Sequence, residues 1–428
     1  MKDPNTRRTT STASRPLRLV ALTAVAGLAL SACGFGGQGG GGGEEEGDGT
    51  TLDLLVPTYS DQTKSLWETV IAGFEKENPD ITVNLEVQSW ENINDVVRTK
   101  VQSDQAPDIL NIDAFAGFVE DDLLYSADEV LSPDTIADFQ ESFVENASMD
   151  GTQYGLPLIA SARTMFYNKD LFTQAGLDPE APPATWDELK DAATKIQALG
   201  GGTYGYGLPL GSEEAQAETA IWFFGNGGGY GDASEITVDT PENLEAAQFF
   251  QSLAVDGVTQ PDAGATDRTP LIDVFIQGKI GMIVGLPPTV GQIAEKNPDL
   301  NYGTAPIATK DGSPVTLGVA DHLMAFENDG DKQDAIKAFL DYYYSPEVYV
   351  PWVDAEGFIP VTKSGGEELA SKESIAPFLE LLPDAQFYPS TNPQWSATQG
   401  AIQSLIGQVA QGKDAQAVLS EIQAKADE

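Results

Sequence analysis

The first part of the folded chain alternates between short apolar runs and stretches with helical spacing. Residues 51–57 (TLDLLVP) form a short apolar run typical of a buried strand. Apolar residues then recur at i, i+3, i+4 and i+7 from Trp67 to Phe74, and Asn78-Pro79 ends this predicted helix. Apolar and polar residues alternate over 81–87, which predicts a strand with one buried face.

The same order continues with a helical stretch at about 93–103 and an apolar run at 106–115 (APDILNIDAF). Strands that alternate with helices are typical of a parallel sheet. In such sheets, ligands bind beyond the carboxyl ends of the strands. The pattern therefore indicates six candidate residues at or after the strand ends, namely Tyr59, Ser60, Asp61, Trp90, Glu91 and Asp113.

A second set of elements begins near the middle of the chain. Residues 163–172 (RTMFYNKDLF) predict a strand that passes into a helix. Thr185 and Glu188 fit a capping box, and Thr240-Pro241 fits the first positions of a further helix. Residues 278–288 (GKIGMIVGLPP) predict a strand that leaves into a loop at its prolines. We therefore expect two α/β units with a cleft between them.

The amino-terminal residues 1–32 have the parts of a secretion signal. Basic residues precede an apolar run from Leu19 to Leu30, which has the length of a signal core and is too short to cross a bilayer. The sequence Leu30-Ser31-Ala32-Cys33 contains the only cysteine and resembles the lipobox of bacterial lipoproteins. That resemblance implies cleavage before Cys33, acylation of this residue and anchoring at the cell membrane. The alternative is an ordinary secretory signal with an incidental thiol.

Composition narrows the choice of partners. Residues 33–50 are rich in Gly and Glu, which predicts a flexible tether. The chain has 23 basic and 66 acidic residues and a formal net charge of −43, which argues against nucleic acid and anionic lipid headgroups as partners. The acids are scattered, so solubility explains them better than a cationic ligand. One cysteine and one histidine rule out an intramolecular disulfide and a His-rich zinc site, and we expect no metal and no cofactor.

An ordered series of segments resembles a known family, the bacterial extracellular solute-binding proteins of family 1. These are the sugar-binding subunits of ABC importers, and the group includes maltose-binding protein. The matching segments are FEKENPDITV (74–83), GLPLIASARTMFYNKDLF (155–172), PPATWDEL (182–189), VFIQGKIGM (274–282), NYGTAPI (301–307), DAIKAFLDYYYSPEVY (334–349) and GFIPV (357–361). The resemblance extends from about residue 51 to the last residue.

The resemblance implies the periplasmic-binding-protein type II fold, which has two α/β lobes that close over a ligand by hinge bending. We expect the amino-terminal lobe to contain 51–158 and 314–350, and the other lobe to contain 159–313 and 351–428. The resemblance further implies a monomer that captures a mono- to oligosaccharide and delivers it to the permease subunits of an ABC importer. No enzymatic activity is implied.

Sugars offer hydroxyl groups and apolar C–H faces, so their sites combine carboxylates and amides with flat aromatic rings. By resemblance, Trp222 is a stacking platform in the second lobe, and Phe358 and Trp395 lie near the cleft. The full set of candidate ligand-binding residues is Tyr59, Ser60, Asp61, Trp90, Glu91, Asp113, Arg163, Trp222, Asn226, Asp321, Phe358 and Trp395.

Each candidate also has a structural explanation: core packing for the aromatic residues, solvation for the carboxylates and bracing of the hinge for Arg163. We expect Trp67, Trp186 and Trp352 to be structural, and the single histidine, His322, to lie in the core or on the surface. Many relatives have Asn-Gly-Pro-Trp where this chain has Gly285-Leu286-Pro287-Pro288. The chain therefore lacks the tryptophan that would stack on a sugar there, which argues against maltodextrins as the ligand.

Three other functions compete with sugar binding. An acidic glycosidase would use a pair of carboxylates, but the sequence has no nucleophile elbow and no phosphate loop. An importer subunit for a polyamine, a metal chelate or a peptide would keep the transport role and change the cargo. A purely structural surface lipoprotein would have no use for a hinge between two lobes.

Overall fold

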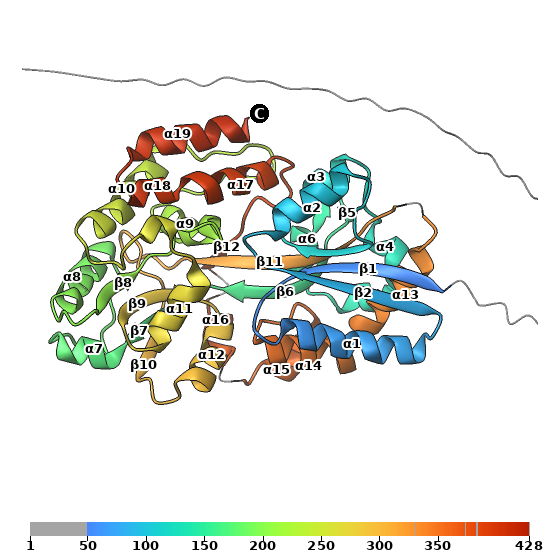
Figure 1. Ribbon diagram of the computed structural model, residues 1–428, viewed down its shortest axis with the longest axis horizontal. Coiled ribbons are helices and arrows are strands. Elements are labelled where there is room, and N and C mark those ends of the chain that lie inside the picture. Colours follow the sequence, from blue (N-terminus) through green and yellow to red (C-terminus); the bar gives the residue numbers. More distant parts are fainter. Residues whose placement is uncertain (1–48, 329, 373, 382–383, 428) are drawn as a thin grey trace, which may run out of the picture. The chain divides into compact units, whose positions relative to one another are not determined.

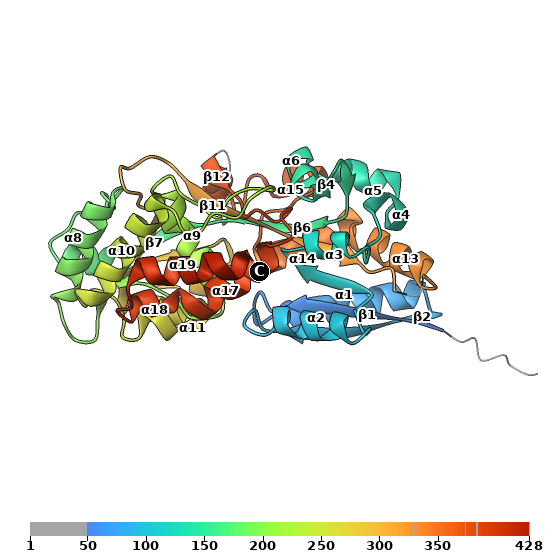
Figure 2. The same cartoon turned by 90° about the horizontal axis from the view of Figure 1, so that it is seen from above.

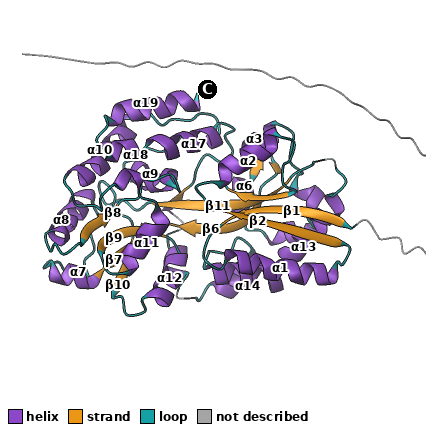
Figure 3. Cartoon of the chain, in the orientation of Figure 1, coloured by secondary structure: helices purple, strands orange, loops and turns teal. Residues whose placement is uncertain are grey.

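The computed structural model describes residues 49–328, 330–372, 374–381 and 384–427 (Figure 1). The predicted signal, the lipidation site at Cys33 and all but the last two residues of the predicted tether lie outside these residues. Strands occupy the interior and helices cover them (Figure 3). Among the described residues, we find no helix with the length and apolar character needed to span a bilayer.

The first sheet has the strand order β12-β11-β3-β1-β2, and β6 also pairs with β11. Its strands are β1 (Thr50–Pro57), β2 (Ile81–Gln88), β3 (Ile109–Ile112), β6 (Leu156–Ala162), β11 (Thr316–Ala325) and β12 (Ala385–Gln386). β1 runs parallel to both β2 and β3, as the strand–helix alternation predicts. β11 runs antiparallel to β3 and to β6. The parallel strands bring the chain segments after β1 and β2 to one edge of the sheet.

Alternate residues of β1 supply the cores on the two faces of this sheet. Leu54 and Val56 join the cluster that contains Trp67 of α1, whereas Leu55 joins Ile93 of α2 on the other face. The helices of this half are α1 (Thr63–Glu77), α2 (Ile93–Gln102), α3 (Ala116–Glu120), α4 (Ala127–Val130), α5 (Pro133–Asp138), α6 (Glu141–Asn146), α13 (Gln333–Tyr343), α14 (Pro346–Glu356) and α15 (Lys363–Leu369). A hairpin of β4 (Ser148–Met149) and β5 (Thr152–Gln153) follows α6. We call this half the first lobe.

The second sheet has the order β10-β7-β9-β8, formed by β7 (Thr164–Asn168), β8 (Tyr204–Gly207), β9 (Ile280–Gly285) and β10 (Tyr302–Ala305). Around it, in the second lobe, lie α7 (Lys169–Gln174), α8 (Trp186–Gln197), α9 (Ala215–Phe224), α10 (Pro241–Val255), η1 (Ala263–Ala265), α11 (Arg268–Ile276), α12 (Pro288–Lys296), α17 (Trp395–Leu405), α18 (Gly407–Ala410) and α19 (Ala415–Ala426). The short α16 (Ala376–Leu379) contributes Phe378 to the large core that includes the first sheet.

Local capping chemistry predicted two helix starts correctly. Thr185 and Glu188 form the capping box of α8, and the Thr240 side chain accepts a hydrogen bond from the backbone N–H of Asn243 in α10. The chain leaves β9 at Gly285 into a loop, as predicted, but the loop is short, because helix α12 already begins at Pro288. Proline suits the first positions of a helix, since its missing N–H would have no partner inside the helix.

Strands β6, β7 and β11 connect the two lobes (Figures 1 and 2). β6 is followed by β7 after a single residue, Arg163, and the chain passes from the first sheet to the second there. β11 begins beside the core of the second lobe with Leu317 and ends in the core of the first with Leu323. The two-lobed α/β fold expected from the sequence is therefore present.

The lobe boundaries expected from the sequence fall inside elements at two points. The boundary at 158/159 lies within β6, and the boundary at 350/351 lies within α14. Trp352 of α14 packs 5.0 Å from Trp67 of α1, measured between ring centroids. Residues 351–356 thus pack with the first lobe, where we expected them in the second, because their apolar side chains complete the core beneath α1.

Candidate functional site

A pocket between the lobes brings together five of the candidate residues. We call it the inner pocket; its cavity volume in this structure is about 30 Å³. Its lining residues are Tyr59, Trp90, Ile159, Ser161, Arg163, Glu214, Arg268, Leu286, Pro288, Thr289, Gln292, Val319, Asp321 and Phe358. The segments after β1, β2 and α14 form one side, α9, α11 and α12 form the other, and β6 and β11 form the floor.

Aromatic rings form the wall contributed by the first lobe. The Tyr59 ring meets Trp90 at 5.7 Å and Phe358 at 5.0 Å between centroids, and both pairs are edge-to-face. Trp90 is only half-buried, whereas Phe358 is buried. Rings packed in this way are held rigidly, so the free surface of Trp90 offers a flat apolar face at low entropic cost.

The floor of the inner pocket is polar. The Tyr59 hydroxyl lies 2.7 Å from Asp321 Oδ2 and 3.0 Å from Asn111 Oδ1. Burial, reinforced by the negative charge of Asp113, raises the pKa of Asp321 to about 8. A protonated Asp321 donates to the Tyr59 oxygen, and the tyrosine proton is then free to bond to Asn111. Asp321 Oδ1 is buried and has no hydrogen-bond partner among the described residues.

The wall contributed by the second lobe carries a cluster of charges. Arg268 Nε donates to Glu214 Oε2 at 2.9 Å, and Arg268 Nη2 lies 3.5 Å from Glu213 Oε1. Arg163 Nη2 lies 3.4 Å from Glu214 Oε2, and its Nη1 lies 3.6 Å from Glu218 Oε1. Burial favours the neutral form of Glu214, but Arg268 and Arg163 hold its pKa below the ordinary value. Burial raises the pKa of Glu218 to about 7 despite the two arginines.

Two other candidates, Asp113 and Trp395, contact each other across the lobes. Trp395 Nε1 lies 3.4 Å from Asp113 Oδ2, and Gln399 Nε2 lies 3.3 Å from the same oxygen. The Trp395 ring is buried and stacks on Tyr388 at 4.9 Å. Burial raises the pKa of Asp113 above its ordinary value. This contact joins the end of β3 to α17, and neither side chain lines the inner pocket.

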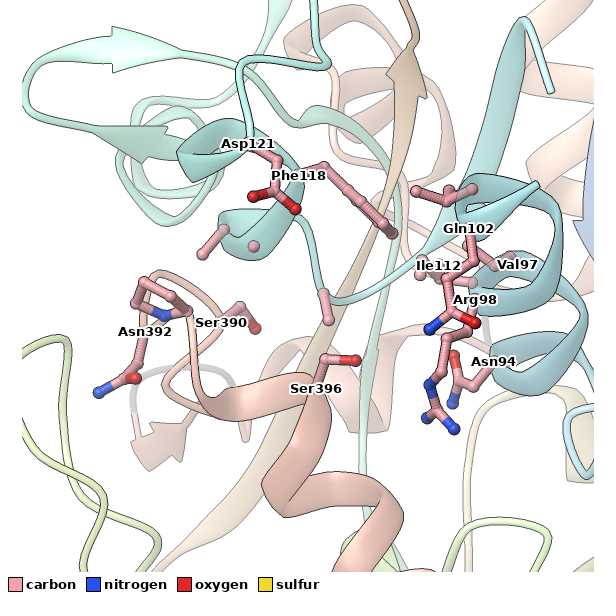
Figure 4. A pocket seen from close by; sticks show the side chains of 15 residues that line it. Asn94, Val97, Arg98, Gln102, Ile112, Phe118, Asp121, Ser390, Asn392 and Ser396 are labelled. Atoms are coloured by element: carbon pink, nitrogen blue, oxygen red, sulfur yellow. The ribbon is translucent and has the colours of Figure 1, made fainter. Parts of the chain in front are cut away.

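A second hollow lies beside this contact, between α2, α3 and the start of α17 (Figure 4). Its cavity volume is about 240 Å³. Val97, Ile112 and Phe118 give it an apolar base, while Asn94 and Arg98 lie at its side. It contains none of the candidate residues, although Ala114 and Ser396 adjoin the Asp113–Trp395 contact in sequence. We call it the outer hollow.

The remaining candidates lie outside the inner pocket. Trp222 is 2% exposed and packs between Trp186 and Tyr206, so its ring has no face left for a ligand in this structure. The expectation of a stacking platform at Trp222 is thus not met, because every residue of α9 is buried. Asn226 Nδ2 donates to the Glu242 carbonyl at 2.8 Å and so fastens the end of α9 to α10.

Three polar candidates face solvent or the rim. Asp61 is exposed and Ser60 is half-buried, and neither lines the inner pocket. Glu91 is exposed on a groove between α2 and α17. The structural tryptophans Trp67, Trp186 and Trp352 are buried as expected, and His322 lies in the core with its ring against Phe115.

Sequence reasoning missed several residues of the inner pocket, above all Glu214 and Arg268. These two residues are separated by 54 positions and meet only in the folded chain. A weak signal was present: Glu214 and Glu218 are four residues apart at the start of a helix that ends in the apolar run Ala220–Phe224, and a carboxylate buried in such a helix needs a partner. We had interpreted such acids as part of a scattered negative surface.

Two lobes connected by strands, with an aromatic and polar pocket between them, define a ligand-binding protein of the two-lobed α/β class. Residues 59–350 match the family model of the bacterial extracellular solute-binding proteins. The chain belongs to this family.

Individual relatives agree with this assignment. A Brucella abortus (strain 2308) protein described only as a binding protein is 35% identical over 393 residues, which cover 89% of this chain and 93% of the relative. An sn-glycerol-3-phosphate-binding periplasmic protein of the same strain is 27% identical over 225 residues, 51% of each chain. An ABC transporter solute-binding protein of Thermotoga lettingae, solved with α-D-tagatose, is 25% identical with a TM-score of 0.77 and covers 88% of this chain and 99% of its own.

Proposed function

We propose that this protein is the substrate-binding lipoprotein of an ABC importer, and that it captures a carbohydrate in the inner pocket and delivers it to the permease. The observation that carries this proposal is the composition of the pocket. An aromatic wall that includes the half-buried Trp90 adjoins polar groups on Asp321 and Arg163, and Asp321 Oδ1 and Arg163 Nε and Nη1 have no hydrogen-bond partner among the described residues. This combination suits the C–H faces and the hydroxyl groups of a sugar. The tagatose held by the Thermotoga relative supports the same class of ligand.

The proposal places the protein outside the cytoplasm, held at the cell membrane by lipid on Cys33. Membership of an extracellular family supports the location. The lipobox-like sequence around Cys33 supports the anchor, and multiple acyl chains would hold the protein stably where a single chain gives marginal binding. The Gly- and Glu-rich segment 33–50 would then act as a tether between the anchor and the lobes.

The proposed lobes are the two halves described above, which close over the ligand by bending at β6, β7 and β11. Tyr59, Trp90, Arg163, Asp321 and Phe358 are the proposed ligand-binding residues. The Asp113–Trp395 contact would form as the lobes approach each other. We propose binding without catalysis, in keeping with the transport role of the family.

A thermal-shift screen tests the proposal, because a ligand that binds only the native state raises its melting temperature. We expect at least one neutral mono- to trisaccharide to raise the melting temperature by several degrees. An importer subunit for a polyamine is the second candidate, favoured by the excess of carboxylates over guanidinium groups around the inner pocket. A shift with spermidine and none across the sugar panel would refute the carbohydrate assignment in favour of this alternative.

A further inference from the structure

The inner pocket has two cationic side chains, and both are already engaged by carboxylates. Among the described residues that line the pocket, Arg163 and Arg268 are the only Arg or Lys side chains. Glu214 lies between them: Arg268 donates to it from Nε and Nη2, and Arg163 Nη2 lies 3.4 Å from both of its carboxylate oxygens. Glu213 and Glu218 supply two further carboxylates within 3.7 Å of a guanidinium nitrogen.

An anionic group in this pocket would therefore meet two guanidinium groups whose charges are already balanced by carboxylates. Phosphate sites use unpaired arginine forks, lysines or free backbone N–H groups at a helix start. Here the helix that begins at the pocket, α12, opens with Pro287 and Pro288, which have no N–H. The next two N–H groups, of Thr289 and Val290, donate to the carbonyls of Leu286 and Pro287 at 2.9 and 3.1 Å. A phosphate would have to leave water and lie beside the carboxylates of Glu213 and Glu214, which repel it, and burying a charge without a net opposite charge nearby is costly.

An uncharged hydroxyl group meets the opposite situation. Nε and Nη1 of Arg163 and Oδ1 of Asp321 are buried and lack hydrogen-bond partners among the described residues. A hydroxyl oxygen accepts from a guanidinium N–H while its proton bonds to a carboxyl oxygen. The raised pKa values of Asp321, about 8, and Glu218, about 7, keep these acids partly or largely protonated near neutral pH. The carboxylates of Glu213 and Glu214 then balance the charges of the two arginines, and the pocket holds no surplus of positive charge.

We infer that the inner pocket selects an uncharged, polyhydroxylated group and rejects a phosphorylated one, and that Glu214 sets this selectivity by neutralising both arginines. The inference rests on the proposed function, since it specifies which class of carbohydrate the importer subunit takes. Membership of the family alone does not predict rejection of phosphate, because one relative is an sn-glycerol-3-phosphate-binding protein.

The test measures binding of sn-glycerol 3-phosphate and inorganic phosphate by calorimetry to the full chain and to Glu214→Gln. Glutamine keeps the shape of the side chain and removes its charge, which leaves the two guanidinium groups under-compensated. We expect the wild type to bind neither phosphate measurably, and Glu214→Gln to bind at least one of them tenfold or more tightly. Glu245→Gln is the matched control, because Glu245 pairs with Lys310 on the surface of the second lobe, and no gain is expected there.

Two results would overturn the inference. One is a wild type that binds either phosphate as tightly as its best neutral sugar, and the other is a folded Glu214→Gln variant with no gain in phosphate affinity. If Glu214→Gln fails to fold, Glu213→Gln removes a neighbouring carboxylate of the same cluster and should show a smaller gain in the same direction. Failure of the sugar panel would refute the proposed function separately, because these phosphate measurements require no knowledge of the sugar.

Discussion

The floor of the inner pocket makes a sharp prediction about pH and stability. Asp321 is 3% exposed, and its pKa is raised to about 8 by burial and by the charge of Asp113. In the unfolded chain an aspartate titrates near 3.9. The native state therefore retains a proton that the unfolded state loses, and the associated stability is fully present below about pH 4 and is lost as the pH rises through about 8.

The size of this effect follows from the separation of the two pKa values. Between them, each pH unit lowers the free energy of unfolding by about 1.4 kcal/mol. From pH 5 to pH 8 the contribution of Asp321 falls by roughly 4 kcal/mol. Asp321→Asn mimics the protonated acid, because its amide can donate to the Tyr59 oxygen, and it cannot titrate. Between pH 5 and pH 8 the wild type should therefore lose roughly 4 kcal/mol more stability than the variant.

Urea unfolding of the ligand-free protein at pH 5 and pH 8 measures this difference directly. The raised pKa of Glu218 also makes stability fall as the pH rises. Because Glu218 is present in both proteins, its effect cancels in the comparison. Asp299→Asn is the control, since Asp299 is exposed in the loop before β10 and its loss removes one charge without touching the pocket. If Asp321→Asn shows the same change in stability from pH 5 to pH 8 as the wild type, Asp321 does not hold a proton in the native state.

Three further predictions follow from other parts of the molecule. Trp222→Phe should lower the free energy of unfolding by about 1–3 kcal/mol through lost core packing and leave ligand affinity unchanged. If the variant instead loses affinity at unchanged stability, Trp222 contacts the ligand. Gly264→Ala places a methyl group against the backbone carbonyl of Gly407 and should cost about 1–3 kcal/mol, so an unchanged melting temperature would show that η1 and α18 separate without penalty. Cys33→Ser should release unprocessed protein from membranes in cell fractionation, and continued membrane attachment of this variant would contradict lipidation at Cys33.

Local patterns in the sequence predicted the elements well where the determining contacts are close in the chain. The apolar spacing from Trp67 to Phe74 anticipated α1, and the capping box of Thr185 with Glu188 anticipated α8, because both depend on residues within one or two helical turns. The ordered family resemblance supplied the two-lobed arrangement, which no single pattern contains. The boundary expected at 350/351 misses the packing of Trp352 on Trp67, because this contact joins residues far apart in the chain and no local pattern reveals it.

The residues of the inner pocket were harder to predict, since the exposure of a side chain and its hydrogen-bond partners are set only in the folded chain. Tyr59 and Trp90 both line the inner pocket, as expected of residues that follow strands whose ends meet at one edge of a sheet. Trp222 was misplaced because an aromatic residue on a helix looks the same in sequence whether it faces a ligand or a core. Glu214 was missed because its partner Arg268 is on another helix.

The central claim is that the inner pocket binds a carbohydrate, and calorimetric titration of the wild type and of Trp90→Ala with the best sugar from the screen tests it most directly. Phe387→Ala serves as the control, since Phe387 is an exposed aromatic residue that does not line the pocket. Stacking on an aromatic face contributes on the order of 1.4 kcal/mol, which corresponds to a tenfold change in affinity. We expect the wild type and Phe387→Ala to bind equally and Trp90→Ala to bind about tenfold more weakly. Undiminished binding by a folded Trp90→Ala variant would contradict the account.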